Sequence, residues 1–163
     1  MPYDHVEAIS NEDQGAAGGA SSNVRQTVTT LTNAQMLALR ATPITVIPAP
    51  GTGRVNQFLN ATLVLNNVAG YTETADNMVV RYVNATGTIA SATIETTGFI
   101  DGAGVDAITF ARAATTDPIL TAAGEVSNAV LVLHNSGDGE WGAGNAANTL
   151  TVICNYRVHQ TNL

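Results

Sequence analysis

The feature that most constrains the fold of this chain is a series of apolar residues at every second position near its C-terminus. Between residues 149 and 158 every second side chain is apolar, namely Leu150, Val152, Cys154, Tyr156 and Val158. Because successive side chains of a β-strand point to opposite faces, this pattern predicts a strand with one face in a core and the other toward solvent. Such half-buried strands are typical of antiparallel sheets.

Segments of the same kind recur from Val24 onward, separated by turns rich in Gly and Asn. They predict strands over residues 24–30, 44–47, 55–66, 78–83, 89–96, 128–134 and 149–158. Many short strands with such turns indicate an all-β fold, either an antiparallel β-sandwich or a jelly-roll-like barrel. The region from Gly98 to Glu125 has no clear period, so it is either a long surface excursion or contains strands that the pattern hides.

The strand at 55–66 is expected to place Val55, Leu59, Ala61, Leu63 and Leu65 on its inner face, although Phe58 and Val64 break the alternation. One short helix is expected over about residues 33–41. Thr32 and Gln35 have the spacing of a capping box, and Pro43 follows at the place where a helix must stop.

The N-terminal residues 1–23 differ from the β-sandwich domain expected over residues 24–163. They include the low-complexity run GAAGGASS at 15–22, which buries little and is entropically costly to order. This segment is either a frayed terminus or an extended, flexible arm that orders against a neighbouring molecule. The spacing of Tyr3, Val6 and Ile9 favours the arm, with these three residues as its anchors.

The charge of the chain limits the partners that it can have. Charged residues are only 12% of the chain, lysine is absent, and the net charge is −7. With no basic patch to neutralise phosphates, we expect no nucleic-acid binding. No apolar run approaches the roughly 18 residues that span a bilayer, and residues 1–15 have no secretion signal. The single Cys154 cannot form an internal disulfide. Since a secretion signal is also lacking, we expect a protein made in the cytoplasm and released by lysis.

No motif in the sequence predicts catalysis, a cofactor or a metal, so we expect a protein that is not an enzyme. Residues 137–142 match GxGxxG, but another strand follows them where a dinucleotide site needs a helix. His134, Asp138 and Glu140 are too few for a calcium site and are interpreted as part of a solvated loop. A hydrolase would need a hidden carboxylate pair, and only Glu73 and Glu95 lie near predicted strands.

Trp141, the only tryptophan, stands in this glycine-rich loop. It is either an exposed contact residue for a partner or a sugar, or a side chain that folds back over the end of the sandwich. The first alternative would make the protein a tail-fibre or carbohydrate-binding module.

Several segments of the sequence, taken in order, resemble the sequences of one family. They are 31–44 (LTNAQMLALRATPI), 48–53 (PAPGTG), 71–77 (YTETADN), 94–101 (IETTGFID) and 131–140 (LVLHNSGDGE). This series resembles the head decoration, or cement, proteins of tailed bacteriophages, and the likeness covers about residues 31–158. The resemblance implies a β-rich virion protein on the outside of the capsid, often a homotrimer, that binds the major capsid protein and clamps neighbouring shell subunits.

Overall fold

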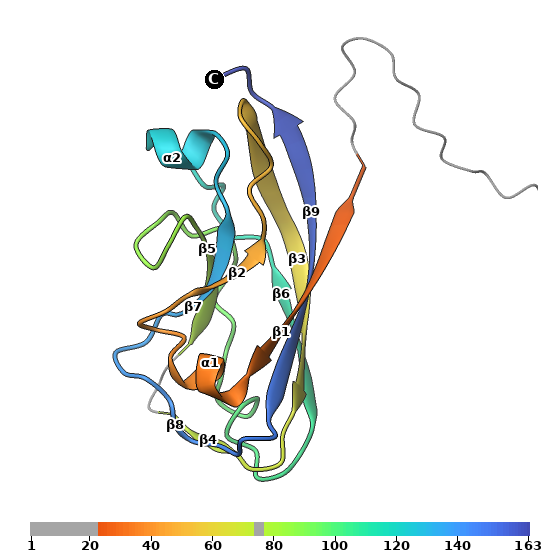
Figure 1. The fold of residues 1–163 in the computed structure, drawn as a ribbon, viewed down its shortest axis with the longest axis vertical. Coiled ribbons are helices and arrows are strands. Elements are labelled where there is room, and N and C mark those ends of the chain that lie inside the picture. The colour runs from red at the N-terminus through yellow and green to blue at the C-terminus, as the bar shows by residue number, and fades with distance from the viewer. Residues whose placement is uncertain (1–22, 74–76) are drawn as a thin grey trace, which may run out of the picture.

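Two antiparallel β-sheets pack face to face in the computed structural model of this protein, which describes residues 23–73 and 77–163 (Figure 1). Tyr3, Val6 and Ile9 lie outside the described residues. The four-stranded sheet has the order β1-β9-β3-β6, formed by β1 (Arg25–Thr32), β9 (Thr149–Gln160), β3 (Arg54–Asn66) and β6 (Ala107–Arg112). The three-stranded sheet has the order β2-β7-β5, formed by β2 (Ile44–Ile47), β7 (Leu131–Asn135) and β5 (Met78–Tyr82). A two-stranded sheet, β4 (Tyr71–Thr72) with β8 (Gly142–Ala143), lies at one end.

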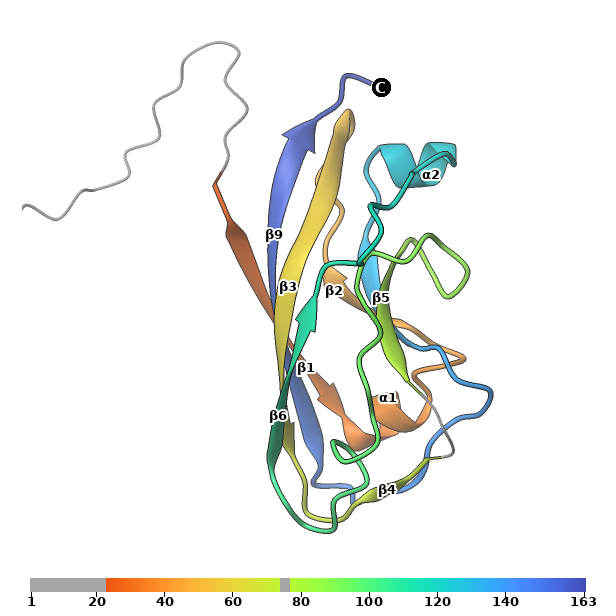
Figure 2. The same cartoon turned by 180° about the vertical axis from the view of Figure 1, so that it is seen from behind.

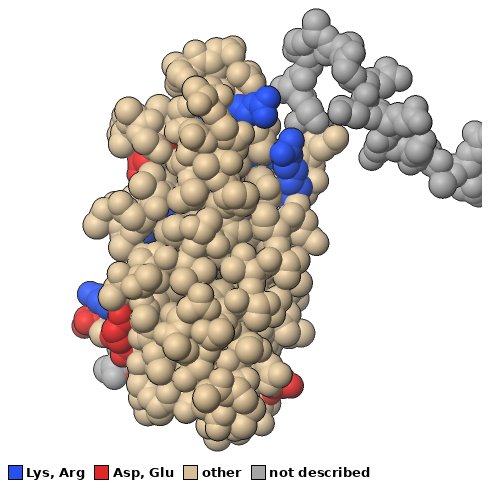
Figure 3. Space-filling view, viewed as in Figure 1, with Lys and Arg blue, Asp and Glu red and all other residues tan. Residues whose placement is uncertain are grey.

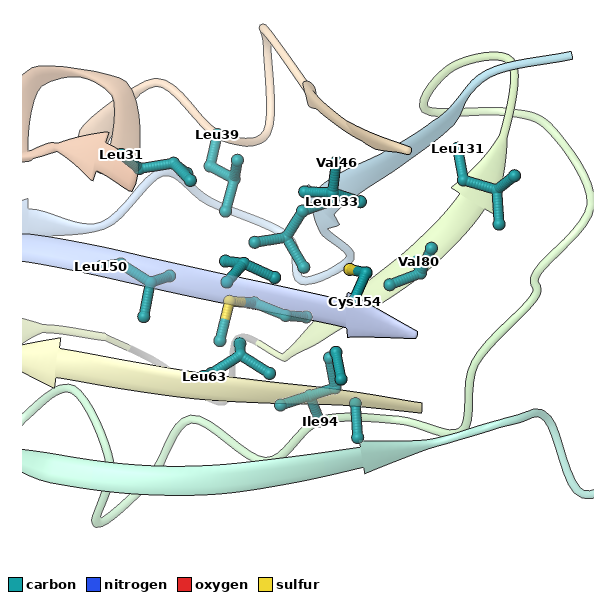
Figure 4. Close-up of a cluster of buried hydrophobic side chains, with 14 of the residues drawn as sticks. Leu31, Leu39, Val46, Leu63, Val80, Ile94, Leu131, Leu133, Leu150 and Cys154 are labelled. Carbon is teal, nitrogen blue, oxygen red and sulfur yellow. The ribbon is translucent and has the colours of Figure 1, made fainter. Parts of the chain in front are cut away.

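The hydrophobic core lies between the two larger sheets (Figure 4). Inner-face side chains from both sheets belong to one buried cluster, which includes Leu31, Leu63, Leu150 and Cys154 from the first and Val46, Val80, Leu131 and Leu133 from the second. The predicted antiparallel, all-β sandwich is therefore confirmed. The strands form separate sheets, so of the two predicted alternatives the structure has the sandwich.

The inner face of β3 differs from the prediction at one end. The pairing of β3 with β9 shifts between Phe58 and Asn60, which marks a β-bulge. Phe58 is buried, whereas Leu59 is only half-buried. A bulge adds one residue to a strand, so the side chains before it change face relative to those after it. This shift explains why Phe58 interrupts the alternation, and it corrects the inward placement predicted for Leu59.

The prediction of a strand at residues 89–96 is wrong. This segment makes only isolated bridges, Arg81 with Ile89, Met78 with Ile94 and Ser91 with Ala113. Its backbone bonds go in two directions, because Ala90 N–H donates to Val80 of β5 and Ala92 N–H donates to Arg112 of β6. The segment therefore links the edges of the two sheets and closes one side of the sandwich, as Figure 2 shows.

Strand β6 lies in the region without a clear period. Its outward residues, Ile108 and Phe110, are large and apolar, whereas the inward residues Ala107, Thr109 and Ala111 are small. The large apolar residues thus face away from the core, which reverses the usual pattern and hides the strand from a sequence reading.

The predicted capping box is confirmed at α1 (Asn33–Leu37). The Thr32 hydroxyl accepts from the Gln35 N–H, and the Gln35 side chain accepts from the Thr32 N–H. The helix ends earlier than predicted and continues as a turn to Ala41. A second helix of one turn, α2 (Ala123–Val126), was not predicted.

A pair of substitutions at adjacent β3 positions tests the assignment of the two faces. Leu63→Ala should lower the free energy of unfolding by about 2–5 kcal/mol, because it leaves a cavity in the core. Val64→Ala, on the outer face, should cost less than about 1 kcal/mol. Denaturant unfolding of dilute protein measures both, and equal losses would contradict this assignment.

Candidate functional site

Acidic side chains hold loops in place. The carboxylate of Glu140 accepts hydrogen bonds from the backbone N–H groups of Arg40 and Ala41, at 3.0 and 2.8 Å. That of Glu125 is buried and accepts from the Thr88 N–H at 2.7 Å and from the Thr88 hydroxyl at 3.0 Å. Both carboxylates satisfy loop donors that would otherwise lack a partner in the fold.

The acids considered for hydrolysis have similar roles. Glu73 accepts from the hydroxyl groups of Thr96 and Thr97. Glu95 accepts from the Thr97 N–H at 3.3 Å. A hydrolytic pair needs two carboxyl groups that face each other across a substrate. The bonds of Glu73 and Glu95 instead go to Thr96 and Thr97, where the turn at residues 97–100 begins, so we find no support for the hydrolase alternative.

The GxGxxG segment at 137–142 forms the loop after β7 and ends at Gly142, the first residue of β8. The next element is the strand β9, as the sequence predicts. The chain that leads from β8 to β9 is held in place by Asn148, which is fully buried. The Asn148 side-chain oxygen accepts from the Val68 and Ala69 N–H groups, and its amide donates to the Ala69 carbonyl oxygen and to Asn67. This network joins two loops at the end of the sandwich that carries β4 and β8.

His134, Asp138 and Glu140 do not form a metal site in the described structure. Both carboxylate oxygens of Glu140 are used by backbone N–H groups. Within residues 23–73 and 77–163, no group of three or more His, Cys, Asp and Glu side chains could hold a metal ion. In the same residues, no helix is long and apolar enough to cross a membrane.

Trp141 is buried, with 3% of its surface exposed. Its ring packs against Tyr71 with the centroids 6.2 Å apart and the planes tilted by 58°. Of the two alternatives for this residue, the structure has the one in which the side chain folds back over the end of the sandwich. Trp141 therefore offers no face to a sugar or a partner, and the carbohydrate-binding alternative loses the residue on which it depended.

Cys154 is a buried core residue, as predicted. Burial raises the pKa of its thiol to about 12, so the thiol is protonated at neutral pH. It is a packing residue and not a nucleophile.

His134 is buried on β7, and its Nδ1 has no hydrogen-bond partner among the described residues. Burial lowers its pKa most, and the positive charges of Arg81 and Arg40 lower it further. A hydrogen bond to the Arg40 backbone and the charge of Glu140 oppose this shift. The net effect favours the neutral imidazole in the folded protein.

The depressed pKa of His134 predicts that acid destabilises the fold. Below about pH 6.5 the unfolded chain binds a proton at this position more readily than the folded chain does. Stability is therefore fully present above that pH and is lost as the pH falls toward the folded-state pKa. Urea unfolding between about pH 7.5 and 5.5 should show a shallower dependence for His134→Gln than for the wild type. Parallel curves for the two proteins would refute the assignment.

The largest candidate for a functional site is the outer face of the four-stranded sheet, which we define as its outward-pointing side chains. Strand register aligns them in rows across the sheet, such as Val28–Ile153–Thr62–Phe110 and Thr30–Thr151–Val64–Ile108. Three of these side chains are strongly exposed: Val28 (61%), Ile108 (61%) and Phe110 (75%). An exposed apolar surface of this kind is typical of a contact with another protein.

Charge is sparse over this part of the molecule. Figure 3 shows that the right-hand flank, along which the four-stranded sheet runs in Figure 1, is uncharged in its middle, with basic side chains above and an acidic one below. Sequence reasoning missed this face because β6, which carries Ile108 and Phe110, was not predicted. The signal was present as the alternation of Ile108, Phe110 and Arg112 with small residues.

Comparison with known proteins found no matching family model and no matching curated protein. Two solved structures are similar over most of their length. One is "Cyanophage Pam1 capsid asymmetric unit", with 15% identity and a TM-score of 0.47 over 96% of this chain and 99% of that chain. The other is "Capsid of Ralstonia phage GP4", with 13% identity and a TM-score of 0.43 over 90% of each chain.

Proposed function

We propose that this protein is a non-enzymatic structural protein of a tailed-bacteriophage virion. Specifically, it is a head decoration protein that binds the major capsid protein on the outside of the mature head and stabilises it, as a homotrimer. The observation that carries the structural role is which of the described side chains bond within the fold and which are exposed. The acids Glu73, Glu125 and Glu140 bind loop donors, whereas one sheet face leaves the large apolar side chains of Val28, Ile108 and Phe110 exposed.

The proposal that the partner is the major capsid protein rests on the resemblance of the segments between residues 31 and 158 to head decoration proteins. The composition supports it, because a chain with 12% charged residues and no lysine can be covered by another protein with little desolvation of charge. A fold that is held by one core and by internal loop hydrogen bonds, without a disulfide, also suits a particle that leaves the cell by lysis.

The proposed mechanism is thermodynamic. A protein that binds the assembled shell and not its separate subunits shifts the assembly equilibrium toward the shell. A trimer multiplies weak contacts, because once one copy is bound the other two are held at high effective concentration. The decoration protein therefore needs no tight individual site in order to stabilise the head.

Copy number in purified particles tests the proposed location. Quantitative mass spectrometry of density-purified particles should find this chain at a copy number comparable to that of the major shell protein. A handful of copies per particle would instead indicate a tail or fibre module. Absence from the particles would overturn the virion role.

Deletion of the N-terminal arm tests its proposed part in attachment. A chain lacking residues 1–23 keeps every strand from β1 onward, so its thermal unfolding should match that of the full chain. Its cosedimentation with shells stripped of this protein should be weaker, because the anchors are lost.

The matched variant retains the arm but replaces Tyr3, Val6 and Ile9 by Ser. It should lose attachment to a similar degree, which would separate the anchors from the mere length of the arm. Unchanged attachment by the truncated chain would eliminate the arm as a contact.

A further inference from the structure

The edge strand β6 carries a stripe of outward side chains with a marked order. Ile108, Phe110 and Arg112 point outward, because their register partners Val64, Thr62 and Asn60 lie on the outer face. Asp106 precedes the strand by one residue, at the next position of the alternation. Its side chain is exposed, and one of its carboxylate oxygens accepts a hydrogen bond from the Asn67 N–H at 2.9 Å. The stripe therefore reads acidic, apolar, apolar, basic from one end to the other.

This stripe is complementary to itself when it is turned end to end. Reversal places Asp106 against the Arg112 of another stripe, and Ile108 against its Phe110. A twofold axis that runs across the strands, midway between Ile108 and Phe110, produces this reversal. Two identical sheets that pack face to face with nearly aligned strands can satisfy such an axis.

The rest of the outer face fits the same partner. Polar side chains of the outer face bond to one another: Thr30 to Thr151 at 3.1 Å, and Asn155 to both Gln26 and Asn60, at 3.2 and 2.8 Å. Because these groups already satisfy much of their hydrogen bonding within the face, covering them is less costly than covering free amides or hydroxyls.

Charge opposes the binding of a second copy less at the outer face than over most other parts of the surface. With a net charge of −7, two copies repel each other wherever acidic groups meet. The outward positions of β1, β3, β6 and β9 carry no acidic residue, and Asp106 at the end of β6 meets an arginine under the twofold arrangement. The outer face thus allows a contact that the overall charge opposes elsewhere.

From these observations we propose that the outer face of the four-stranded sheet binds the same face of a second copy of this chain, about a twofold axis that pairs Asp106 with Arg112. Four strands about 4.8 Å apart and about eight residues long cover roughly 500 Å², so the pair buries about 1,000 Å², the lower range of specific interfaces. The interface is therefore weak in solution and forms at raised concentration.

The inference deepens the proposed function and rests on it in one respect. A twofold contact cannot close a trimer, so in the proposed assembly it joins copies that belong to neighbouring trimers. Such a contact adds links between decoration units on the same shell. Copy number in particles is independent of it, so the two proposals can fail separately.

Sedimentation velocity of the full chain over a concentration series tests the interface. The mass of the wild type should rise to at least twice that of its smallest species as concentration rises, because each copy in a species offers one such face. Phe110→Ser, Asp106→Arg and Arg112→Asp should each raise the dissociation constant of this doubling step by about tenfold or more. Thermal unfolding identifies any variant that fails to fold, including Asp106→Arg, which also loses the hydrogen bond from the Asn67 N–H.

A mixing experiment separates the interface from folding. Asp106→Arg and Arg112→Asp each bring like charges together in their own pairs, but an equimolar mixture restores both opposite-charge contacts. The mixture should therefore associate about as tightly as the wild type.

Two exposed loop residues outside the face provide controls, and Ile119→Ser and Asp117→Arg should leave the doubling unchanged. The proposal is overturned if the wild type never doubles its mass, if the three face variants bind like the wild type, or if the mixture stays dissociated.

Discussion

The antiparallel pairing of β3 with β9 is the constraint on which the rest of this structure depends. It runs from Arg54 opposite Gln160 to Asn66 opposite Thr149, so two segments about ninety residues apart in the chain form the middle of one sheet. Their inner residues, including Leu63 and Leu150, provide the surface on which the three-stranded sheet packs. Strands β1 and β6 add at the two sides, and the position of each edge follows from this central pair.

The sequence predicted those parts of the fold in which apolar side chains face the core. The alternation in β9 and the capping box at Thr32 are local signals, and both are confirmed. The failures among the strands share a cause, because in these segments the apolar residues do not follow one face that points to the core. In β3 the bulge near Leu59 changes the face, and in β6 the large apolar residues point outward. The segment 89–96 bonds alternately to two sheets, which no single-strand pattern can indicate.

The candidate site was predicted less well than the fold, because the sequence draws attention to chemically distinctive residues. His134, Trp141 and Glu140 stand out in a chain with few such side chains, yet each has a structural role within the described fold. The outer face consists of ordinary residues whose importance comes from alignment across strands. Thr62 and Phe110 become neighbours only through the register of β3 with β6, which depends on tertiary structure.

The burial of Cys154 bears on the environments that this protein can occupy. With a single cysteine in the chain, and its thiol protonated inside the core, the described domain keeps the same covalent structure in reducing and in oxidising surroundings. The domain has no maturation step that waits for an oxidant, and no bond that a reductant can cleave. Once the domain has folded, its stability therefore does not depend on whether its surroundings are reducing or oxidising.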